Sequence, residues 1–365
     1  MRSAIATLLI SIMISLLPVY NRIAGLDMNR TSKDNLFVVL CGFIAVIFNK
    51  SLREFPLKAW IVSAIALFLM VVNQHNPSSI FVMMYTFYAC AGLFFFIRFY
   101  ECFDVKDADC ILDGMCIGSL IQAFFILMNG LGYSPETWMM GLFNDNIQVN
   151  GTMFNKFGAS PGTLGNPNLS GGYLALCSLA FFRKKWIYLL PISLAALAST
   201  GAAMGVLSFI AGTLYYFKGN LISKRNTYLL TIFSMFLVFF TGLKGMDSGR
   251  FEIWRMMFDK IQFTDYLFGN GLAWFQDLKM AWSDTYVAQE HSSYLTLFNT
   301  FGIVGALAFL GYLWKFINTK DENKLFSAIL FTAFCNAYGH FSIQQSTMMI
   351  IILVTIAICA IKENE

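Results

Sequence analysis

Long apolar stretches alternate with polar connectors along almost the whole chain. Each stretch approaches the ~20 residues with which a helix crosses ~30 Å of hydrocarbon. Lipid offers no partner to backbone N–H and C=O groups, so the pattern predicts spanning helices rather than strands. We count about twelve stretches, near residues 4–20, 36–49, 57–72, 78–97, 110–129, 166–182, 186–200, 202–217, 227–241, 292–314, 325–340 and 345–361.

Two connectors are much longer than the others, and they cover about residues 130–165 and 242–291. Long connectors commonly carry function, because the entropy of ordering them must be offset. The second contains an amphipathic helix near 248–263, in which apolar residues recur every three or four positions: Phe251, Trp254, Met257, Phe258 and Ile261. Arg250 falls four residues before Trp254 and shares its face, and a Gly-rich turn follows at 267–275.

Composition agrees with a membrane protein. The chain has 365 residues, of which 57% are apolar and 13% charged, whereas soluble domains carry about 25% charged residues. We therefore expect one all-α, polytopic transmembrane domain over residues 1–365. The net charge of +4 gives no indication of nucleic-acid binding.

The distribution of basic residues predicts the orientation. With the N-terminus in the cytoplasm and the spans alternating, 16 of the 25 Lys and Arg residues fall inside, including those at 183–185 and 224–225. Both termini are then cytoplasmic, and both long connectors face outward. No Cys/His spacing indicates a metal site, and the long outer connectors hold no cysteine, so no disulfide framework is predicted.

The first long connector ends in "GTLGNPNLSGGYLAL" at 162–176. Its glycines and prolines predict an irregular entry to the next span, with Asn168 or Ser170 capping that helix. Glycines also let a backbone approach a ligand closely. Substrate contact and simple helix capping are both compatible with Asn166 and Asn168.

Three motifs follow one another along the chain. They are the stretch at 162–176, "SGRFEIW" at 248–254 with "LFGNGLAWF" after it, and "HSSYLTLFNTFGIVGALAFL" at 291–310. The arrangement resembles the O-antigen ligase and O-antigen polymerase superfamily of bacterial inner-membrane proteins, well over 160–315 and in topology alone before that. The resemblance implies a helical membrane fold like that of the GT-C glycosyltransferases. It also implies transfer of a glycan from undecaprenyl pyrophosphate at the periplasmic face, without metal, cofactor or nucleotide sugar.

The resemblance assigns the chemistry to His291 and Arg250 as catalytic residues. A permanently charged arginine suits a departing pyrophosphate, and an imidazole suits the proton of an acceptor hydroxyl. Further contacts to the pyrophosphate or glycan are expected from six residues, namely Arg255, Lys244, Asn166, Asn168, Glu290 and His340. Many family members also carry an arginine in a Ser-Arg-Gly stretch at the outer end of a span. The comparable "ASTGAAMGVL" at 198–207 has none, and Lys156 or Lys244 would have to serve instead.

The sequence leaves the acceptor open. A lipid-linked glycan would make the protein a surface-polysaccharide polymerase, with a chain-length regulator as a further partner. Lipid A core would make it a ligase, and a protein side chain an O-linking oligosaccharyltransferase. A flippase or transporter is the alternative from another class, but such proteins place ionisable groups within their spans. In this chain the predicted spans are nearly free of ionisable groups, and Asp113 is the main exception.

Overall fold

The computed structural model describes part of the chain in detail. The described residues are 108–131, 162–164, 167–183, 185–217, 250–260, 263–269, 292–317 and 324–338, together with positions 8, 11, 12, 14–16, 348, 351, 352, 354–356, 358 and 359. Every regular element in these stretches is a helix, and none is a strand. The expected all-α class is therefore confirmed for the described residues. The predicted spans at 36–49, 57–72, 78–97 and 227–241 lie outside them.

Most of the described helices coincide with predicted apolar stretches, and the others lie in the two long connectors. They are α5 (Ala108–Gly130), η3 (Gly162–Leu164), α8 (Pro167–Ser178) with η4 (Leu179–Phe182), η5 (Ile187–Leu189), α9 (Leu190–Ser199), α10 (Ala203–Tyr216), α12 (Arg250–Lys260), α13 (Phe263–Phe268), α14 (Ser293–Ile317) and α15 (Lys324–Asn336). The described positions at both ends of the chain are also helical.

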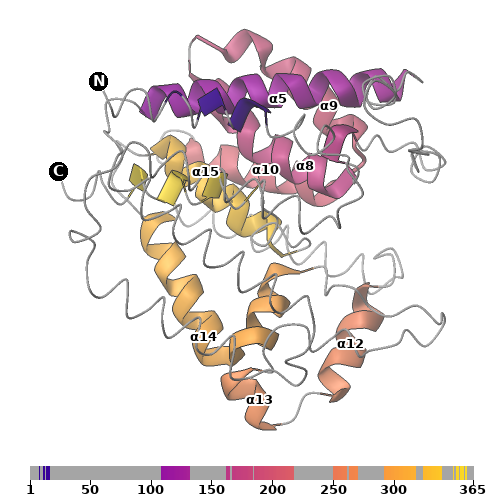
Figure 1. The fold of residues 1–365 in the computed structure, drawn as a ribbon, viewed down its shortest axis with the longest axis vertical. Helices are drawn as coiled ribbons and strands as arrows, with labels where there is room; N and C mark the ends of the chain where they lie inside the picture. The colour runs from indigo at the N-terminus through magenta and orange to yellow at the C-terminus, as the bar shows by residue number, and fades with distance from the viewer. Residues whose placement is uncertain are drawn as a thin grey trace.

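Five of the described helices, α5, α8, α9, α10 and α15, form a bundle (Figure 1). α8 contacts α5, α9, α10 and α15, and α10 packs most extensively on α15. Nearly all of α8 is buried, including the large ring of Tyr173. Figure 1 shows α12, α13 and most of α14 extending away from this bundle.

Glycines let the bundle helices approach closely. A Cβ on Gly205 of α10 would lie 2.8 Å from the backbone carbonyl group of Gly171 in α8. A Cβ on Gly172 would lie 2.9 Å from the side-chain oxygen of Asn336 in α15. Small residues at helix crossings of this kind are typical of membrane proteins, where close backbone contact replaces the hydrophobic effect as the source of association.

Polar side chains inside the bundle are joined across helices. Gln122 of α5 donates to Ser170 of α8 at 2.8 Å and accepts from Thr163 at 2.5 Å. Ser193 of α9 lies 2.6 Å from both Ser119 and Ser178. Such bonds satisfy groups that would be costly to bury alone.

α14 differs from the single straight span expected near 292–314. It consists of two helical segments joined at Gly302, whose φ of 67° and ψ of −175° are not helical. Essentially only glycine adopts that region without strain. The backbone of Leu267 and Phe268 in α13 occupies the space where a Cβ on Gly302 would lie. The kink therefore makes room for α13.

Among the described helices, α5 alone is both long enough and apolar enough to cross a membrane. The segments Ile187–Ser199, Ala203–Tyr216 and Lys324–Asn336 are apolar but shorter. A central helix of a soluble protein meets the same criterion as α5, so this helix does not by itself establish the twelve-span topology.

Candidate functional site

The first motif forms the N-terminal turns of α8. This helix begins at Pro167, so Asn168 and Ser170 lie inside it. The predicted capping role is therefore wrong for both residues. Ser170 instead accepts the bond from Gln122, and Asn168 is partly buried in the first turn. Proline at the first helical position is favoured because its missing N–H needs no partner there.

Asn336, the last residue of α15, joins the first motif to α10. Its side-chain amide donates to the hydroxyl of Ser208 at 3.2 Å, and it is 1% exposed. Its oxygen faces Gly172 closely enough that a Cβ there would clash. The start of α8, the start of α10 and the end of α15 therefore meet at one end of the bundle.

The third motif reaches the same end of the bundle. The amide of Ser293, at the start of α14, donates to the carbonyl of Ala337 at 2.9 Å. The Tyr294 hydroxyl bonds the carbonyl of Phe334, close to the end of α15. These bonds fix the chain that follows His291 in sequence directly beside Asn336.

The described part of the second motif forms the start of α12. The rings of Trp254 and Tyr338 meet edge to face with centroids 6.3 Å apart. Met257 is fully buried, and its sulfur lies 3.9 Å from the side-chain amide of Asn299 in α14. Residues 254 and 257 are therefore on the face of α12 that packs against the other motifs. Position 250 is the first of α12 and shares that face, by the helical period of 3.6 residues.

Arg255 lies on another side of α12. It is two positions from Met257, which places it about 200° around the helix. Its side chain is 85% exposed, and its nitrogen lies 4.0 Å from the carboxylate of Asp259. The expected contact of Arg255 with a pyrophosphate therefore receives no support from its position.

The other predicted site residues lie outside the described residues. They are Lys244, Asn166, Glu290, His291 and His340, as well as the side chain of Arg250. Their roles stay predictions. The structure brings the described parts of all three motifs together around residues 336–338.

The stretch at 198–207, for which the resemblance implied an arginine, packs closely against α8. Ala202 is 2% exposed at the start of α10, and its Cβ lies against Gly171 of α8. The preceding Gly201 has a φ of 65° in the turn from α9. A long charged side chain at position 202 would separate α8 from α10.

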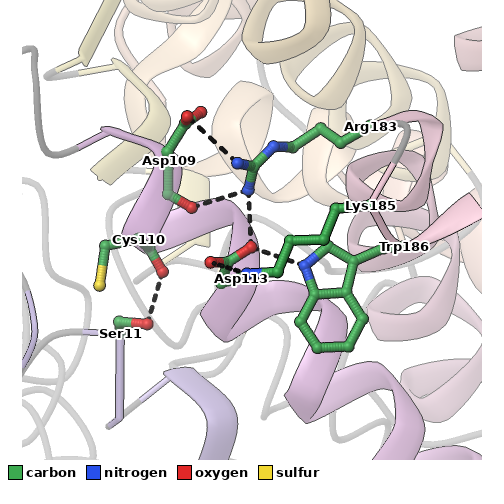
Figure 2. Close-up of polar contacts among 7 residues, drawn as sticks. All are labelled: Ser11, Asp109, Cys110, Asp113, Arg183, Lys185 and Trp186. Carbon is green, nitrogen blue, oxygen red and sulfur yellow. Dashed lines mark hydrogen bonds and ion pairs between the residues drawn. The ribbon is translucent and has the colours of Figure 1, made fainter.

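A polar cluster that the sequence patterns did not predict lies at the other end of α5 (Figure 2). The carboxylate of Asp113 accepts from Arg183 at 2.7 Å, from Lys185 at 3.2 Å and from the indole N–H of Trp186 at 2.6 Å. Arg183 also reaches the carboxylate of Asp109 at 3.1 Å. The sequence did contain an indication of this cluster, because the predicted topology puts Asp113 and the basic residues 183–185 on the same side of the membrane.

This cluster is a latch rather than a reaction centre. Two carboxylates face two cations, so the charges are matched, and Figure 2 shows the side chains turned toward one another. It ties the first turns of α5 to the segment after η4. Within the described residues, no three His, Cys, Asp or Glu side chains are grouped so that they would hold a metal ion.

Comparison of the chain with protein-family models, with curated proteins and with solved structures found no match.

Proposed function

We propose that this protein is a membrane glycosyltransferase that uses a glycan linked to undecaprenyl pyrophosphate as its donor. In this proposal about twelve helices span the bacterial inner membrane, both termini are cytoplasmic, and the site faces the periplasm. A lipid-linked glycan is the preferred acceptor, which makes the protein a polymerase of surface polysaccharide. Lipid A core, which would make it a ligase, and a protein side chain are the alternatives.

One observation carries this proposal: three motifs from separate parts of the sequence meet at one end of the bundle. Gly172 lies against Asn336, Ser293 bonds Ala337, and Trp254 contacts Tyr338. Arg250 begins the helix that carries Trp254, and His291 precedes Ser293 by two residues. Such an arrangement would supply the cation and the proton acceptor that a transferase acting on a lipid-linked substrate needs.

The proposed reaction follows from these two groups. An acceptor hydroxyl oxygen attacks the anomeric carbon of the donor, and the bond from that carbon to the pyrophosphate oxygen breaks. His291 takes the hydroxyl proton, while Arg250 stabilises the negative charge that develops on the leaving pyrophosphate. Arginine suits that role because its guanidinium stays charged and binds phosphate oxygens in pairs.

The test is substitution in cells that depend on this protein. We expect His291→Ala and Arg250→Ala to insert normally, to stop glycan assembly and to accumulate the lipid-linked unit. Loss of one oxyanion-stabilising or acid–base group typically costs on the order of 10²–10⁴ in rate. Arg250→Lys keeps the charge but not the paired geometry, so it should retain part of the activity.

His75→Ala is the matched control, because this histidine belongs to a short predicted turn away from all three motifs. Full-length surface glycan in both alanine variants would refute the transferase. Loss of export without accumulation of a lipid-linked unit on the outer face would favour the flippase. The product made by active protein, a longer lipid-linked glycan or glycan on lipid A core, distinguishes polymerase from ligase.

A further inference from the structure

α13 carries an exposed apolar face, in a connector that the sequence pattern places outside the spans. Phe263 is 80% exposed, Leu267 39% and Phe268 60%. The three positions fall within about 140° of the helix circumference, so they form one face. Large apolar side chains gathered in this way mark a surface that something else covers.

The rest of α13 is fixed to α14. The ring of Tyr266 lies 5.7 Å from that of Phe298. On another side, the backbone of Leu267 and Phe268 fits against Gly302, where the kink leaves space for it. The exposed face of α13 is therefore presented by a firmly seated helix.

The apolar exposure continues onto α14. Ile303 and Val304, directly after Gly302, are 45% and 60% exposed, and Leu307 is 63% exposed. The exposed apolar surface of α13 thus adjoins further exposed apolar side chains on α14. Phe124 on α5, the described helix long enough to cross a membrane, is 53% exposed as well.

The exposed side chains of α12 include charges, unlike the large exposed side chains of α13. Arg255 and Asp259, on α12, have side chains 85% and 71% exposed. Exposed charges therefore gather on α12, which also exposes Phe258 at 43%, whereas the large exposed side chains of α13 are all apolar. A helix with this distribution is suited to lie in the interface plane of a bilayer.

We propose that α13 is embedded in the bilayer interface, with Phe263, Leu267 and Phe268 among the acyl chains and the exposed charges of α12 in water. The occupant of this surface is thus phospholipid, not a protein partner or a second copy of the chain. The inference rests on the membrane placement within the proposed function and not on the transfer reaction.

Site-specific photocrosslinking on the full chain in its own membrane tests this proposal. p-Benzoylphenylalanine replaces Phe263 in one variant and Phe268 in another, and adducts are identified by mass spectrometry after irradiation. The probe resembles phenylalanine and the positions are exposed, so the fold should tolerate it. We expect phospholipid adducts at both positions and several-fold fewer with the probe at Arg255.

The probe at Phe124 separates this inference from the membrane placement itself. Phospholipid adducts at Phe124 together with none at Phe263 and Phe268 would overturn the role of α13 while leaving a membrane protein. The absence of phospholipid adducts at all three positions would overturn both. Adducts to another protein or to a second copy at Phe263 would overturn the choice of lipid as occupant.

Discussion

At the scale of single residues, Asp113 makes the contacts that can be tested most directly. One carboxylate serves Arg183, Lys185 and Trp186, and 26% of its side chain is exposed. Asp113→Ala leaves those donors without their acceptor, which should lower the free energy of unfolding by about 1–3 kcal/mol. Thermal unfolding of the purified protein in detergent measures the effect.

Asp109→Ala is the matched control for that substitution. Asp109 pairs with the same arginine, but its side chain is 76% exposed. Exposed pairs contribute about 0–1 kcal/mol because water screens them. Equal losses of stability for the two variants would contradict the latch described for Asp113.

Asn336 and Ser208 form the second residue-level prediction. Their hydrogen bond is buried between α15 and α10, and each single alanine variant leaves a buried polar group behind. We expect each to cost about 1–3 kcal/mol, and the double variant to cost clearly less than the sum. A double-mutant cycle on unfolding midpoints measures that coupling, and strict additivity would show that the bond contributes nothing.

Some residue positions were predictable and others were not. The face of α12 followed from its period, because Trp254 and Met257 recur with the helix and do pack inward. The junction at Asn336 was not predictable, since it depends on how closely Gly171 and Gly172 let three helices cross. Hydropathy does not reveal such crossings, because an apolar run can contain a glycine at a helix crossing as readily as a residue that faces lipid.

At the scale of elements, hydropathy located the helices but not their irregularities. The stretches at 110–129, 166–182, 202–217 and 325–340 are helical over most of their length, as predicted. The kink of α14 stayed hidden because Gly302 sits in an unbroken apolar run. α13 was missed because six residues give too little periodicity, although its end at Gly269 matches the expected Gly-rich turn.

The kink gives a prediction with an internal control on the same helix. Gly302→Ala puts a side chain into a backbone region costing about 1–3 kcal/mol, and its Cβ would also displace α13. Gly311→Ala meets no atom within 4 Å and replaces glycine in a helix, which should be neutral or stabilise by up to about 1 kcal/mol. Limited proteolysis near α13 and thermal unfolding should change for Gly302→Ala alone. A stable Gly302→Ala variant with an intact α13 would show that α14 does not need its kink.

At the scale of the whole molecule, the described contacts separate two ends of the helix bundle. The first turns of α5 are latched to the segment after η4, while the end of α15 holds the starts of α8, α10 and α14 at the other end. Basic residues cluster at the first of these ends and the motifs at the second. Because cytoplasmic connectors are the ones enriched in Lys and Arg, the motif end should be periplasmic.

Reporter fusions check this orientation independently of any enzymatic activity. Alkaline phosphatase needs disulfides that form only in an oxidising compartment. Fused after Gly245, in the connector before α12, it should be active; fused after Gly219, beyond α10, it should be inactive. A fluorescent protein that folds only in the cytoplasm should fluoresce when fused after Glu365. Activity at Gly219 with none at Gly245 would invert the molecule and turn the candidate site toward the cytoplasm, where a donor carried on the outer leaflet could not reach it.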